Sequence, residues 1–443
     1  MDADVVVVGA GLAGLRCAHV LAQAGRAVVM LETAHAVGGR QRTDEVDGFL
    51  LDRGFQVLNP AYPAVQRWVD LEALVLRPFG AGLQVRRERG LVELTHPLRA
   101  PGGLAATLRS GLLSPRAVAA LARWAGPAVV APRRVIAGAL AADRSLREGL
   151  DRAGVRGPLR TEVIEPFLAG VLAEDRGETS EAFARLLVRM FALGVPGVPA
   201  NGIRALPEQL AGRARAAGVD VRLGGRVTSL SADAGRTVLT LAGGSGVSAR
   251  AAVVAVGPDA VAGLLPLPAP ATKGLQTWWF DAPQAPTAST LLMVDGRRRG
   301  PIVNAAVMSN AAPSYAPAGR HLVQVTCLLA PDGTGGTEAE VRRQAGEMFG
   351  ASPADWGLLR RDDILHALPT QPAPLRTVSR ARVSPGVYVA GDHRDTASHR
   401  LGRGQREPLV QRRDDRDLGL PIQLDDALVG DAVPGRGLAV AAQ

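Results

Sequence analysis

The stretch VVVVGAGLAGLRCAHVLAQAGRAVVMLE, from Val5 to Glu32, decides the fold of this chain. Its four consecutive valines are typical of a short strand that is buried on both faces of a parallel sheet. A helical pattern follows and stops at Gly25, a residue type common at helix C-termini. A second apolar run, AVVML, then leads to Glu32. The order of these segments predicts a strand–helix–strand unit and therefore an α/β fold.

Three glycines between the first strand and the helix have the spacing G-x-G-x-x-G. The first permits a tight turn, the second lets a pyrophosphate approach the backbone, and the third lets helix and strand pack closely. The helix N-terminus attracts phosphates, and an acid at the end of the second strand can accept ribose hydroxyls. We therefore predict a dinucleotide site formed by Gly9, Gly11, Leu12, Ala13, Gly14 and Glu32. The acid argues against NADP, whose extra phosphate it would repel, but leaves NAD and FAD open.

A second glycine–arginine segment, AVGGRQRT, follows soon after the acid. Gly38 and Gly39 again permit a close approach of the backbone, and Arg40 and Arg42 offer cations to a diphosphate. The segment GFLLDRGFQVL comes next and places Asp52, Gly54 and Gln56 along an extended stretch. NAD dehydrogenases do not normally need this second glycine–arginine turn, so these segments favour FAD.

With these motifs the chain resembles the superfamily of FAD-dependent amine oxidases, phytoene desaturases and protoporphyrinogen oxidases. The motif DRGFQVL-x-x-AYP, from Asp52 to Pro63, is most similar to the phytoene desaturase-like branch of NAD(P)/FAD-dependent oxidoreductases. The resemblance implies FAD as cofactor, a GGR turn that contacts the dinucleotide and a D-x-G segment beside the flavin. It also implies a Rossmann-like FAD/NAD(P)-binding domain, discontinuous in sequence, with an inserted helical-plus-sheet substrate domain.

The resemblance divides the chain into six segments, the last of which is an atypical tail at 399–443. FAD-binding parts are expected at 1–80, 196–265 and 371–398, a helical substrate domain at 81–195 and a substrate-domain sheet at 266–370. The sequence from about Leu83 to Arg189 is rich in Ala, Leu and Arg and is predicted to be helical. Further helices are predicted from Gly202 through Leu210 and from Glu338 to Phe349.

Four more cofactor contacts are implied by the resemblance. Val227 would approach the adenine through its backbone, and Gly257 would lie close to the cofactor at the end of a buried strand. A strand from Val387 to Ala390 leads to Gly391 and Asp392, where the acid would meet the ribityl or diphosphate region of FAD.

The tail at 399–443 is atypical. Relatives continue from the closing Gly-Asp turn into a helix of small residues, whereas HRLGRGQRE stands here and lacks an apolar face. Reading GC-rich codons for His399 to Glu407 with the first base dropped gives Ile-Gly-Ser-Ala-Val-Ala-Ser-Gly, which is close to the expected helix. Our hypothesis is a single-base frameshift after about Ser398, which the DNA sequence would test.

The sequence assigns no catalytic residue. It contains no triad, no G-x-S-x-G elbow and no spacing of metal ligands. A flavin carries the difficult step itself, so a strong acid–base pair is not required. Three weak candidates are His393 beside the closing turn, Lys273, which could act on a flavin-bound water but is expected to be exposed, and Trp279, for which a core position is favoured over a pocket wall.

The amino-acid composition limits the classes of partner that the protein is expected to bind. The 443 residues are 47% apolar and 21% charged, as in a globular protein. The net charge of +9 is carried by arginine, since Lys273 is the only lysine, and aromatic residues are only 4%. Stacking platforms for nucleic acid are therefore not expected. Peripheral membrane contact through the helical region is conceivable but not favoured, and no oligomeric state can be assigned.

The expected location is cytoplasmic. Two cysteines exclude a disulfide scaffold, no signal peptide is visible, and no apolar run is long enough for a transmembrane helix. The predicted function is an FAD-dependent oxidoreductase that removes a hydride or two electrons from an apolar or amine-bearing small molecule, in the manner of desaturases or amine oxidases. Two alternatives are an NAD-dependent Rossmann dehydrogenase and a decayed, non-catalytic flavin-fold protein.

Overall fold

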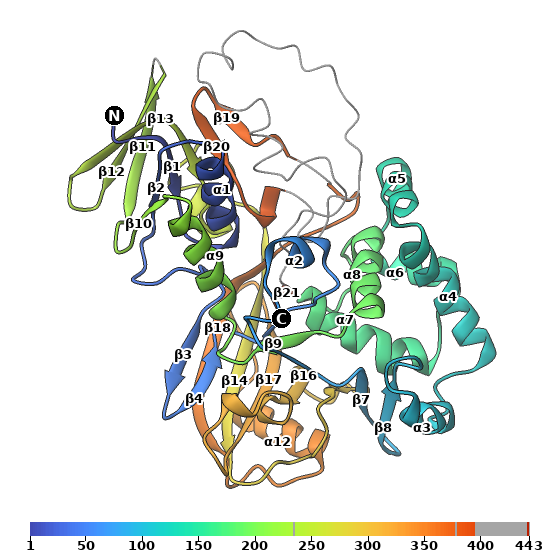
Figure 1. Ribbon diagram of the computed structural model, residues 1–443. Coiled ribbons are helices and arrows are strands. Elements are labelled where there is room, and N and C mark those ends of the chain that lie inside the picture. The colour runs from blue at the N-terminus through green and yellow to red at the C-terminus, as the bar shows by residue number, and fades with distance from the viewer. Residues whose placement is uncertain (234, 377–378, 395–440, 443) are drawn as a thin grey trace.

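The computed structural model describes residues 1–233, 235–376, 379–394 and 441–442. Most of its strands belong to two large sheets. The first sheet lies at the upper left of Figure 1, the second lies below it, and a layer of helices lies to the right. The frameshift hypothesis for the tail concerns residues outside the described ranges, apart from two residues near the C-terminus.

The first sheet begins with the predicted strand–helix–strand unit. Strand β1 (Ala3–Val8) pairs in parallel with β2 (Val28–Leu31) and with β13 (Gly246–Val254). Helix α1 (Leu12–Gln23) connects β1 to β2. The order is β10-β2-β1-β13-β12-β11, and β20 pairs with both β13 and β19. The other strands are β10 (Asp220–Arg222), β11 (Val227–Asp233), β12 (Arg236–Leu241), β19 (Arg382–Ser384) and β20 (Val387–Val389).

The parallel strands of this sheet explain where a ligand can bind. β10, β2, β1, β13 and β20 all run in the same direction, so their carboxyl ends meet at one edge of the sheet. Val5 and Val7 of β1 pack with residues of α1 and α9 (Ala205–Ala216), whereas Val6 and Val8 pack on the opposite face. The α/β prediction, with a Rossmann-like parallel sheet, is confirmed.

The second sheet is mixed and has the order β18-β14-β17-β16-β15-β7-β8. Its strands are β7 (Gly82–Arg87), β8 (Gly90–Thr95), β14 (Thr272–Ala282), β15 (Leu292–Asp295), β16 (Ile302–Val307), β17 (His321–Leu329) and β18 (Gly357–Pro369). Helix α12 (Glu338–Phe349) starts and ends where the sequence predicted, and it packs on the face that carries Trp278 and Phe280.

The prediction of a helical region from about Leu83 is wrong for β7 and β8. These strands form a hairpin that pairs with β15 and extends the second sheet to its edge. The arginines and glutamates of an edge hairpin interrupt the apolar run by which a buried strand is recognised. The sequence pattern therefore could not separate this hairpin from the helices that follow it.

The helical layer follows this hairpin in sequence. It contains α3 (Leu104–Arg109), α4 (Pro115–Val130), α5 (Pro132–Ala142), α6 (Leu146–Ala153), the π-helical turn η2 (Leu159–Ile164), α7 (Glu165–Leu172) and α8 (Glu181–Leu193). Ser114, Ser145 and Ser180 each precede a helix and accept a hydrogen bond from a backbone N–H of its first turn. Such caps satisfy N–H groups that the helix itself leaves unpaired.

Short elements connect the layers. They are the hairpin of β3 (Thr43–Val46) and β4 (Phe49–Asp52), the pair β5 (Gln56–Val57) and β21 (Ala441–Ala442), the pair β6 (Leu76–Pro78) and β9 (Gly197–Pro199), the helices α2 (Pro63–Trp68), α10 (Pro258–Val261) and α11 (Met308–Ala311), and the 3-10 turns η1 (Pro101–Gly103), η3 (Pro313–Tyr315) and η4 (Asp392–Arg394). The helix predicted to begin at Gly202 is present, but it begins at Ala205 as α9. Gly202 instead adopts φ +83° in the preceding turn.

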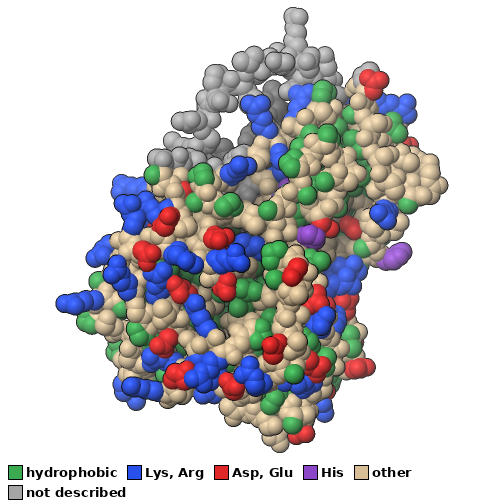
Figure 2. All heavy atoms as spheres, turned by 180° about the vertical axis from the view of Figure 1, so that it is seen from behind, with side chains coloured by type: hydrophobic (Ala, Val, Ile, Leu, Met, Phe, Trp, Pro, Cys, Tyr) green, Lys and Arg blue, Asp and Glu red, His purple; other side chains and the backbone are tan. Residues whose placement is uncertain are grey.

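The surface of the described residues carries mixed charge on the face seen in Figure 2. Arginine side chains and acidic side chains are interspersed there rather than gathered into one large field. Within the described ranges, none of the helices combines the length and the apolar character that crossing a bilayer requires.

Candidate active site

The three glycines of the first turn each meet a different surrounding. A Cβ atom added at Gly9, where φ is +102°, would lie 2.6 Å from the carbonyl oxygen of Ala255, and one added at Gly14 would lie 2.0 Å from the carbonyl oxygen of Gly9. A Cβ atom at Gly11 would meet no described atom within 4 Å. Gly9 and Gly14 are therefore required by the protein itself, whereas Gly11 borders open space in which a ligand can approach the backbone.

The N-terminus of α1 borders the same space. The helix begins at Leu12 and Ala13 without a side-chain cap and without an acidic residue in its first turn. The second glycine turn lies against it, because a Cβ atom at Gly39 would lie 3.3 Å from the Cα atom of Gly11 and the N–H of Gly38 donates to the Ala10 carbonyl over 2.8 Å. An uncapped helix N-terminus beside two glycine turns fits the diphosphate of a dinucleotide.

Glu32 is held in place at the end of β2. Its Oε2 atom accepts a hydrogen bond from the N–H of Ala10 over 2.6 Å, and its Oε1 atom accepts one from the N–H of Ala34 over 2.9 Å. The N–H of Gly225 donates to the Glu32 backbone carbonyl over 2.9 Å, so the loop that leads to Val227 passes beside this acid. The carboxylate can still accept ribose hydroxyls through its remaining lone pairs.

Arg40 connects the second glycine turn to the far end of the chain. Its guanidinium donates to the Asp392 carboxylate over 2.5 Å and to the Ala367 carbonyl over 2.6 Å. Burial alone would raise the pKa of Asp392, but the charge of Arg40 and the neighbouring His393 lower it to about 2. Gln56 adds a third connection, since its Nε2 atom donates to the Arg40 carbonyl over 2.8 Å.

The closing turn lies at the same edge of the sheet. The N–H of Ala390 donates to the Val254 carbonyl over 3.0 Å, so Gly391 follows directly from the β13 pairing, and Gly257 follows the end of β13. His393 is buried against Gly391, and neither ring nitrogen makes a hydrogen bond with a described residue. Its Nδ1 atom lies 3.9 Å from Asp392 Oδ1. A catalytic role for His393 stays a prediction.

Asp52 occupies a closed hydrogen-bonded cluster. Its carboxylate is fully buried and accepts from Thr43 Oγ1 over 2.6 Å, from the N–H of Ile203 over 3.0 Å and from Tyr315 Oη over 3.0 Å. Burial raises the pKa of Asp52 to about 6, and the hydrogen bonds and the charge of Arg360 only partly oppose this shift. Three protein donors already engage this carboxylate, so the structure gives it a bracing role beside its predicted role at the cofactor.

Two other residues of the predicted cofactor site, Gly54 and Arg42, lie outside this hydrogen-bonded cluster. Gly54 has φ +84°, a backbone conformation that favours glycine. Arg42 is half-buried, and its carbonyl accepts from the N–H of Arg53 over 2.8 Å. Cofactor contacts of Gly54 and Arg42 stay predictions.

Lys273 is not the exposed lysine that the sequence predicted. Its Nζ atom donates to Thr179 Oγ1 over 2.8 Å and to the carbonyl of Leu172 over 3.1 Å, at the C-terminus of α7. Burial lowers the pKa of Lys273 to about 8, although Glu174 and Glu178 oppose this shift. A flexible lysine on a strand end gave no sequence signal for this contact, which only the packing of α7 on the second sheet creates.

Trp279 is a core residue, as the sequence favoured. Its side chain is fully buried with Phe55 and Phe79, and its Nε1 atom donates to Asp362 over 3.1 Å. Trp278 points to the opposite face of the sheet and stacks with Phe280. Trp279 does not line the cavity described next.

A cavity of about 390 Å³ lies between the helical layer and the β7–β8 edge of the second sheet. Its lining is almost entirely apolar and comprises Phe55, Val57, Phe79, Gly80, Ala81, Gly82, Leu83, Leu94, Thr95, His96, Arg99, Thr107, Leu113, Leu121, Trp124, Leu159, Val163, Ile164, Phe167, Leu168, Val188, Phe191, Gly194, Val195, Pro196 and Leu292. The described residues that line it include no aspartate or glutamate. Such a cavity fits an apolar ligand.

The cavity touches the segment that belongs to the predicted cofactor site. Phe55 and Val57 line the cavity, and Gln56 between them donates to the Arg40 carbonyl. One strand, β5, therefore contributes to both places. A molecule in the cavity would lie next to the D-x-G segment, which the resemblance predicts to lie beside the flavin.

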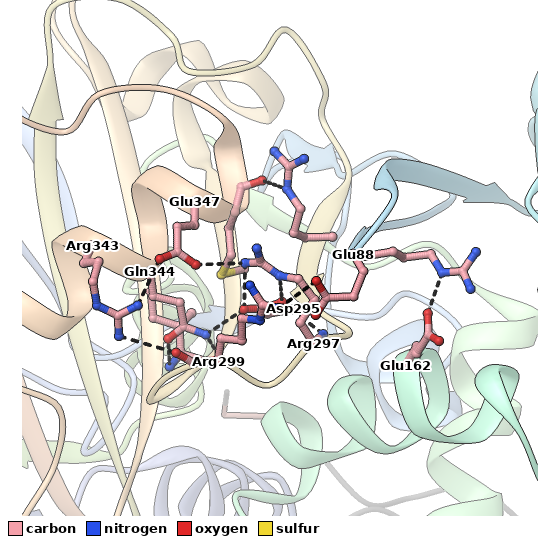
Figure 3. A network of polar contacts seen from close by, with 12 residues as sticks. Glu88, Glu162, Asp295, Arg297, Arg299, Arg343, Gln344 and Glu347 are labelled. Atoms are coloured by element: carbon pink, nitrogen blue, oxygen red, sulfur yellow. Dashed lines mark hydrogen bonds and ion pairs between the residues drawn. The ribbon is translucent and has the colours of Figure 1, made fainter.

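A polar network links the β7–β8 hairpin to neighbouring elements (Figure 3). Arg87 pairs with Glu162 of η2, whose neighbour Val163 faces the cavity. Across the network, Arg299 pairs with Glu88 over 2.7 Å and Gln344 donates to Asp295 over 3.0 Å. The β7–β8 hairpin, η2 and α12 are thereby connected. The network lies outside the cavity and leaves its interior apolar.

The cavity residues are the part of the site that sequence reasoning missed. Phe167 and Phe191, from α7 and α8, contact each other with ring centroids 5.0 Å apart, and Trp124 comes from α4. Apolar residues at helical spacing read as ordinary core, because the pattern is the same whether a helix faces a packed interior or a cavity. No signal in the sequence separates the two.

Comparisons with known proteins agree with this arrangement. A family model described as flavin containing amine oxidoreductase matches residues 12–400. Putrescine oxidase from Kocuria rosea is 46% identical over 70 residues, which cover 16% of this chain and 15% of that protein. L-amino-acid oxidase from Bungarus fasciatus is 43% identical over 77 residues, which cover 17% and 15%. The chain thus spans only a small part of the length of these curated relatives.

Solved structures share the fold over most of this chain. An oxidoreductase from Methanosarcina mazei superimposes with a TM-score of 0.68 at 18% identity, covering 88% of this chain and 94% of that one. Putrescine oxidase bound to putrescine superimposes with a TM-score of 0.59 at 18% identity, covering 88% and 93%. The family model ends at residue 400, close to Ser398, where the sequence departs from the expected closing helix. On the family match and the fold, the chain belongs to the flavin-containing amine oxidoreductase family.

Proposed function

We propose that this protein is an FAD-dependent oxidoreductase that removes a hydride, or two electrons, from a predominantly apolar substrate. The observation that carries this proposal is the apolar cavity that reaches the D-x-G segment through Phe55 and Val57. Described lining residues offer no carboxylate to an ammonium group. Placing a cation there would cost several kcal/mol, because a charge in an apolar environment must be paired.

The residues of the sheet edge support FAD as the cofactor. Gly11 and the uncapped α1 N-terminus would receive the diphosphate, Glu32 the ribose, and Arg40 with Asp392 the part of the molecule nearer the flavin. When bound, FAD supplies an acceptor for the hydride or electron pair. The chain itself would hold the substrate in the cavity and keep water from it with the rings of Phe55, Phe167 and Phe191.

A second candidate is oxidation of an amine. The likeness to putrescine oxidase and L-amino-acid oxidases supports it. An amine that carries a long apolar part would suit the cavity better than a small diamine, since the described lining residues offer polar side-chain groups only at Thr95, His96, Arg99, Thr107 and the indole N–H of Trp124. The two buried free thiols, Cys17 and Cys327, are compatible with the cytoplasmic location that the sequence predicted.

Two measurements test the proposal. Purified protein should show the absorption bands of a bound flavin, and a colourless protein that cannot be loaded with FAD would favour the decayed alternative or an NAD-dependent dehydrogenase. Anaerobic mixing with a panel of polyenes, lipophilic amines, putrescine and amino acids should then bleach the flavin with the apolar members. Bleaching by putrescine or by small amino acids alone would contradict the preference for apolar substrates.

A further inference from the structure

Strand β18 departs from regular pairing with β14 at two places. At the first, Leu359 is an extra residue between the two residues that oppose Trp279 and Phe280. At the second, the pairing shifts between Ile364 and Leu368. Bulges re-aim groups of the strand that carries them and are frequent next to active sites. Each irregularity of β18 directs a group of this strand at a segment of the predicted cofactor site.

The first bulge decides which side chains of β18 face inward. The inner face of the second sheet, opposite to α12, carries Trp279. Arg360 lies opposite Trp279 in the ladder, and Asp362 accepts a hydrogen bond from the Trp279 indole over 3.1 Å. Arg361, between them, instead lies over the ring of Trp278 on the other face. Because side chains alternate along a strand, one extra residue exchanges the two faces for the residues that follow it.

Arg360 holds the D-x-G segment by its backbone. Its guanidinium donates to the carbonyl of Leu51 over 3.1 Å and to the carbonyl of Asp52 over 2.8 Å. It also pairs with Asp44 of β3 over 2.9 Å and donates to Asp362 over 3.0 Å. The β3–β4 hairpin accordingly lies beside β18 in Figure 1. One planar fork serves all four acceptors, a geometry that a lysine does not provide.

Asp362 and Thr277 hold the next residues of the same segment. Burial raises the pKa of Asp362, and its polar neighbours, among them the backbone N–H of Gly54, oppose this shift. The N–H of Phe55 donates to Thr277 Oγ1 over 3.4 Å. Groups from β14 and β18 therefore hold the D-x-G segment against the inner face of the second sheet.

The second irregularity of β18 contacts the second glycine turn. The carbonyl of Ala367 accepts a hydrogen bond from Arg40 over 2.6 Å, and Arg40 pairs with Asp392 of the closing turn. Gln56 donates to the Arg40 carbonyl over 2.8 Å, and its neighbour Phe55 lines the apolar cavity. The D-x-G segment thus lies between the cavity and the edge of the nucleotide-binding sheet, and β18 touches both of its ends.

We infer that Arg360 and Asp362 are positioning residues, which fix Gly54 and Phe55 between a bound flavin and the apolar cavity. The inference rests on the proposed function, because it takes FAD as the cofactor at this sheet edge. Neither side chain is among the described residues that line the cavity, so both act through the D-x-G segment. A displacement of about 1 Å at such a position can slow a chemical step about 100-fold.

Three variants of the full-length protein test the inference with FAD itself as the probe. Arg360→Met and Asp362→Asn should each raise the dissociation constant of FAD by about tenfold, because the D-x-G segment is no longer preorganised. Both should also shift the absorption maximum and the midpoint potential of the bound flavin. Arg360→Lys keeps the charge but loses the planar fork, so it should behave like Arg360→Met. If Arg360→Met does not fold, the other two variants decide the result.

The neighbouring residues of β18 supply matched controls. Arg361 and Asp363 alternate with the tested residues on the same strand, are exposed, and pair with each other over 2.6 Å. Arg361→Met and Asp363→Asn therefore make the same chemical changes away from the D-x-G segment. Both should leave the affinity for FAD and the flavin spectrum unchanged. The melting temperature of each apoprotein measures the stability that each variant loses.

A loss of stability alone would overturn the inference. If the Arg360 and Asp362 variants match the controls in FAD affinity, flavin spectrum and midpoint potential, the two residues serve the fold only, even where the melting temperature falls. Failure of the proposed substrate class is a separate result: no member of the substrate panel would bleach the flavin, while the FAD measurements still decide the role of Arg360 and Asp362. An unaltered protein that binds no FAD would overturn both.

Discussion

Arg40 and Asp392 are separated by 352 positions in the sequence, and their side chains form an ion pair of 2.5 Å. The pair joins the second glycine turn to the closing Gly-Asp turn, so the first and last described parts of the nucleotide-binding sheet meet there. The same guanidinium donates to the Ala367 carbonyl at the end of β18, which belongs to the second sheet. One arginine therefore connects three segments at the boundary between the two large sheets.

Removing the charge of Asp392 should weaken the closing turn in a pH-dependent way. Because the pKa of Asp392 is lowered to about 2 in the folded protein, its contribution to stability is fully present above about pH 4 and is lost as the pH falls toward 2. Asp392→Asn should therefore lower the melting temperature at pH 5 to 7 and flatten its decline below about pH 4. Parallel melting curves for both proteins across the acid range would contradict this assignment.

Gly11 and Gly14 should respond differently to substitution. Gly11→Val puts its side chain into open space, so the apoprotein should fold while flavin content falls by more than about tenfold. Gly14→Ala puts a Cβ atom against the Gly9 carbonyl and should cost about 2–4 kcal/mol of stability. Flavin absorbance per polypeptide and melting of the apoprotein separate the two effects. Full flavin loading of Gly11→Val would show that no cofactor occupies this space.

Asp52 should have the opposite pH signature from Asp392. Its folded pKa is raised to about 6 by burial, so the folded state holds its proton more tightly than the unfolded state does, and stability falls as the pH rises from about 4 to about 6. The loss amounts to about 3 kcal/mol at most. Asp52→Asn keeps a neutral group among Thr43, Ile203 and Tyr315 and should abolish this decline. Denaturant unfolding at a series of pH values measures it, and an unchanged slope in the variant would refute the prediction.

A carboxylate placed in the cavity should block apolar substrates. Phe167→Glu introduces a charge among apolar rings, which should raise KM by about 100-fold or more while flavin content stays constant. Leu365→Glu, on an exposed part of β18, is the matched control and should change nothing. Phe167→Ala enlarges the cavity, and its KM provides a second measurement if the Phe167→Glu variant folds poorly. Unchanged KM in both Phe167 variants would mean that the substrate binds elsewhere.

Lys273 should act as an anchor of α7. Lys273→Met removes the hydrogen bonds to the Leu172 carbonyl and to Thr179, and should destabilise the protein by about 1–3 kcal/mol with little effect on kcat. Thermal melting and the pH profile of kcat measure the two quantities together. If the lysine instead touches the reacting atoms, the variant would lose a titration near pH 8 from the kcat profile, where the pKa of Lys273 lies.

The sequence by itself determined the nucleotide-binding half of this protein. The valine run, the glycine spacing and Glu32 are local signals. They predict, in that order, a buried parallel strand, a tight turn and an acid at a strand end. These signals predicted the sheet edge at which Glu32, Gly257 and Gly391 now lie. The limits of α12 were equally readable, because Thr337 caps its start and Gly350 its end.

Only the tertiary structure decided where the apolar cavity lies and how its walls are held. The β7–β8 hairpin is an edge element whose partner, β15, is distant in sequence, so no local pattern revealed it. The cavity, the closed cluster of Asp52 and the contact of Lys273 with α7 likewise depend on which surfaces meet. A helical apolar stripe is the same whether it faces core or cavity, and long-range packing alone distinguishes them.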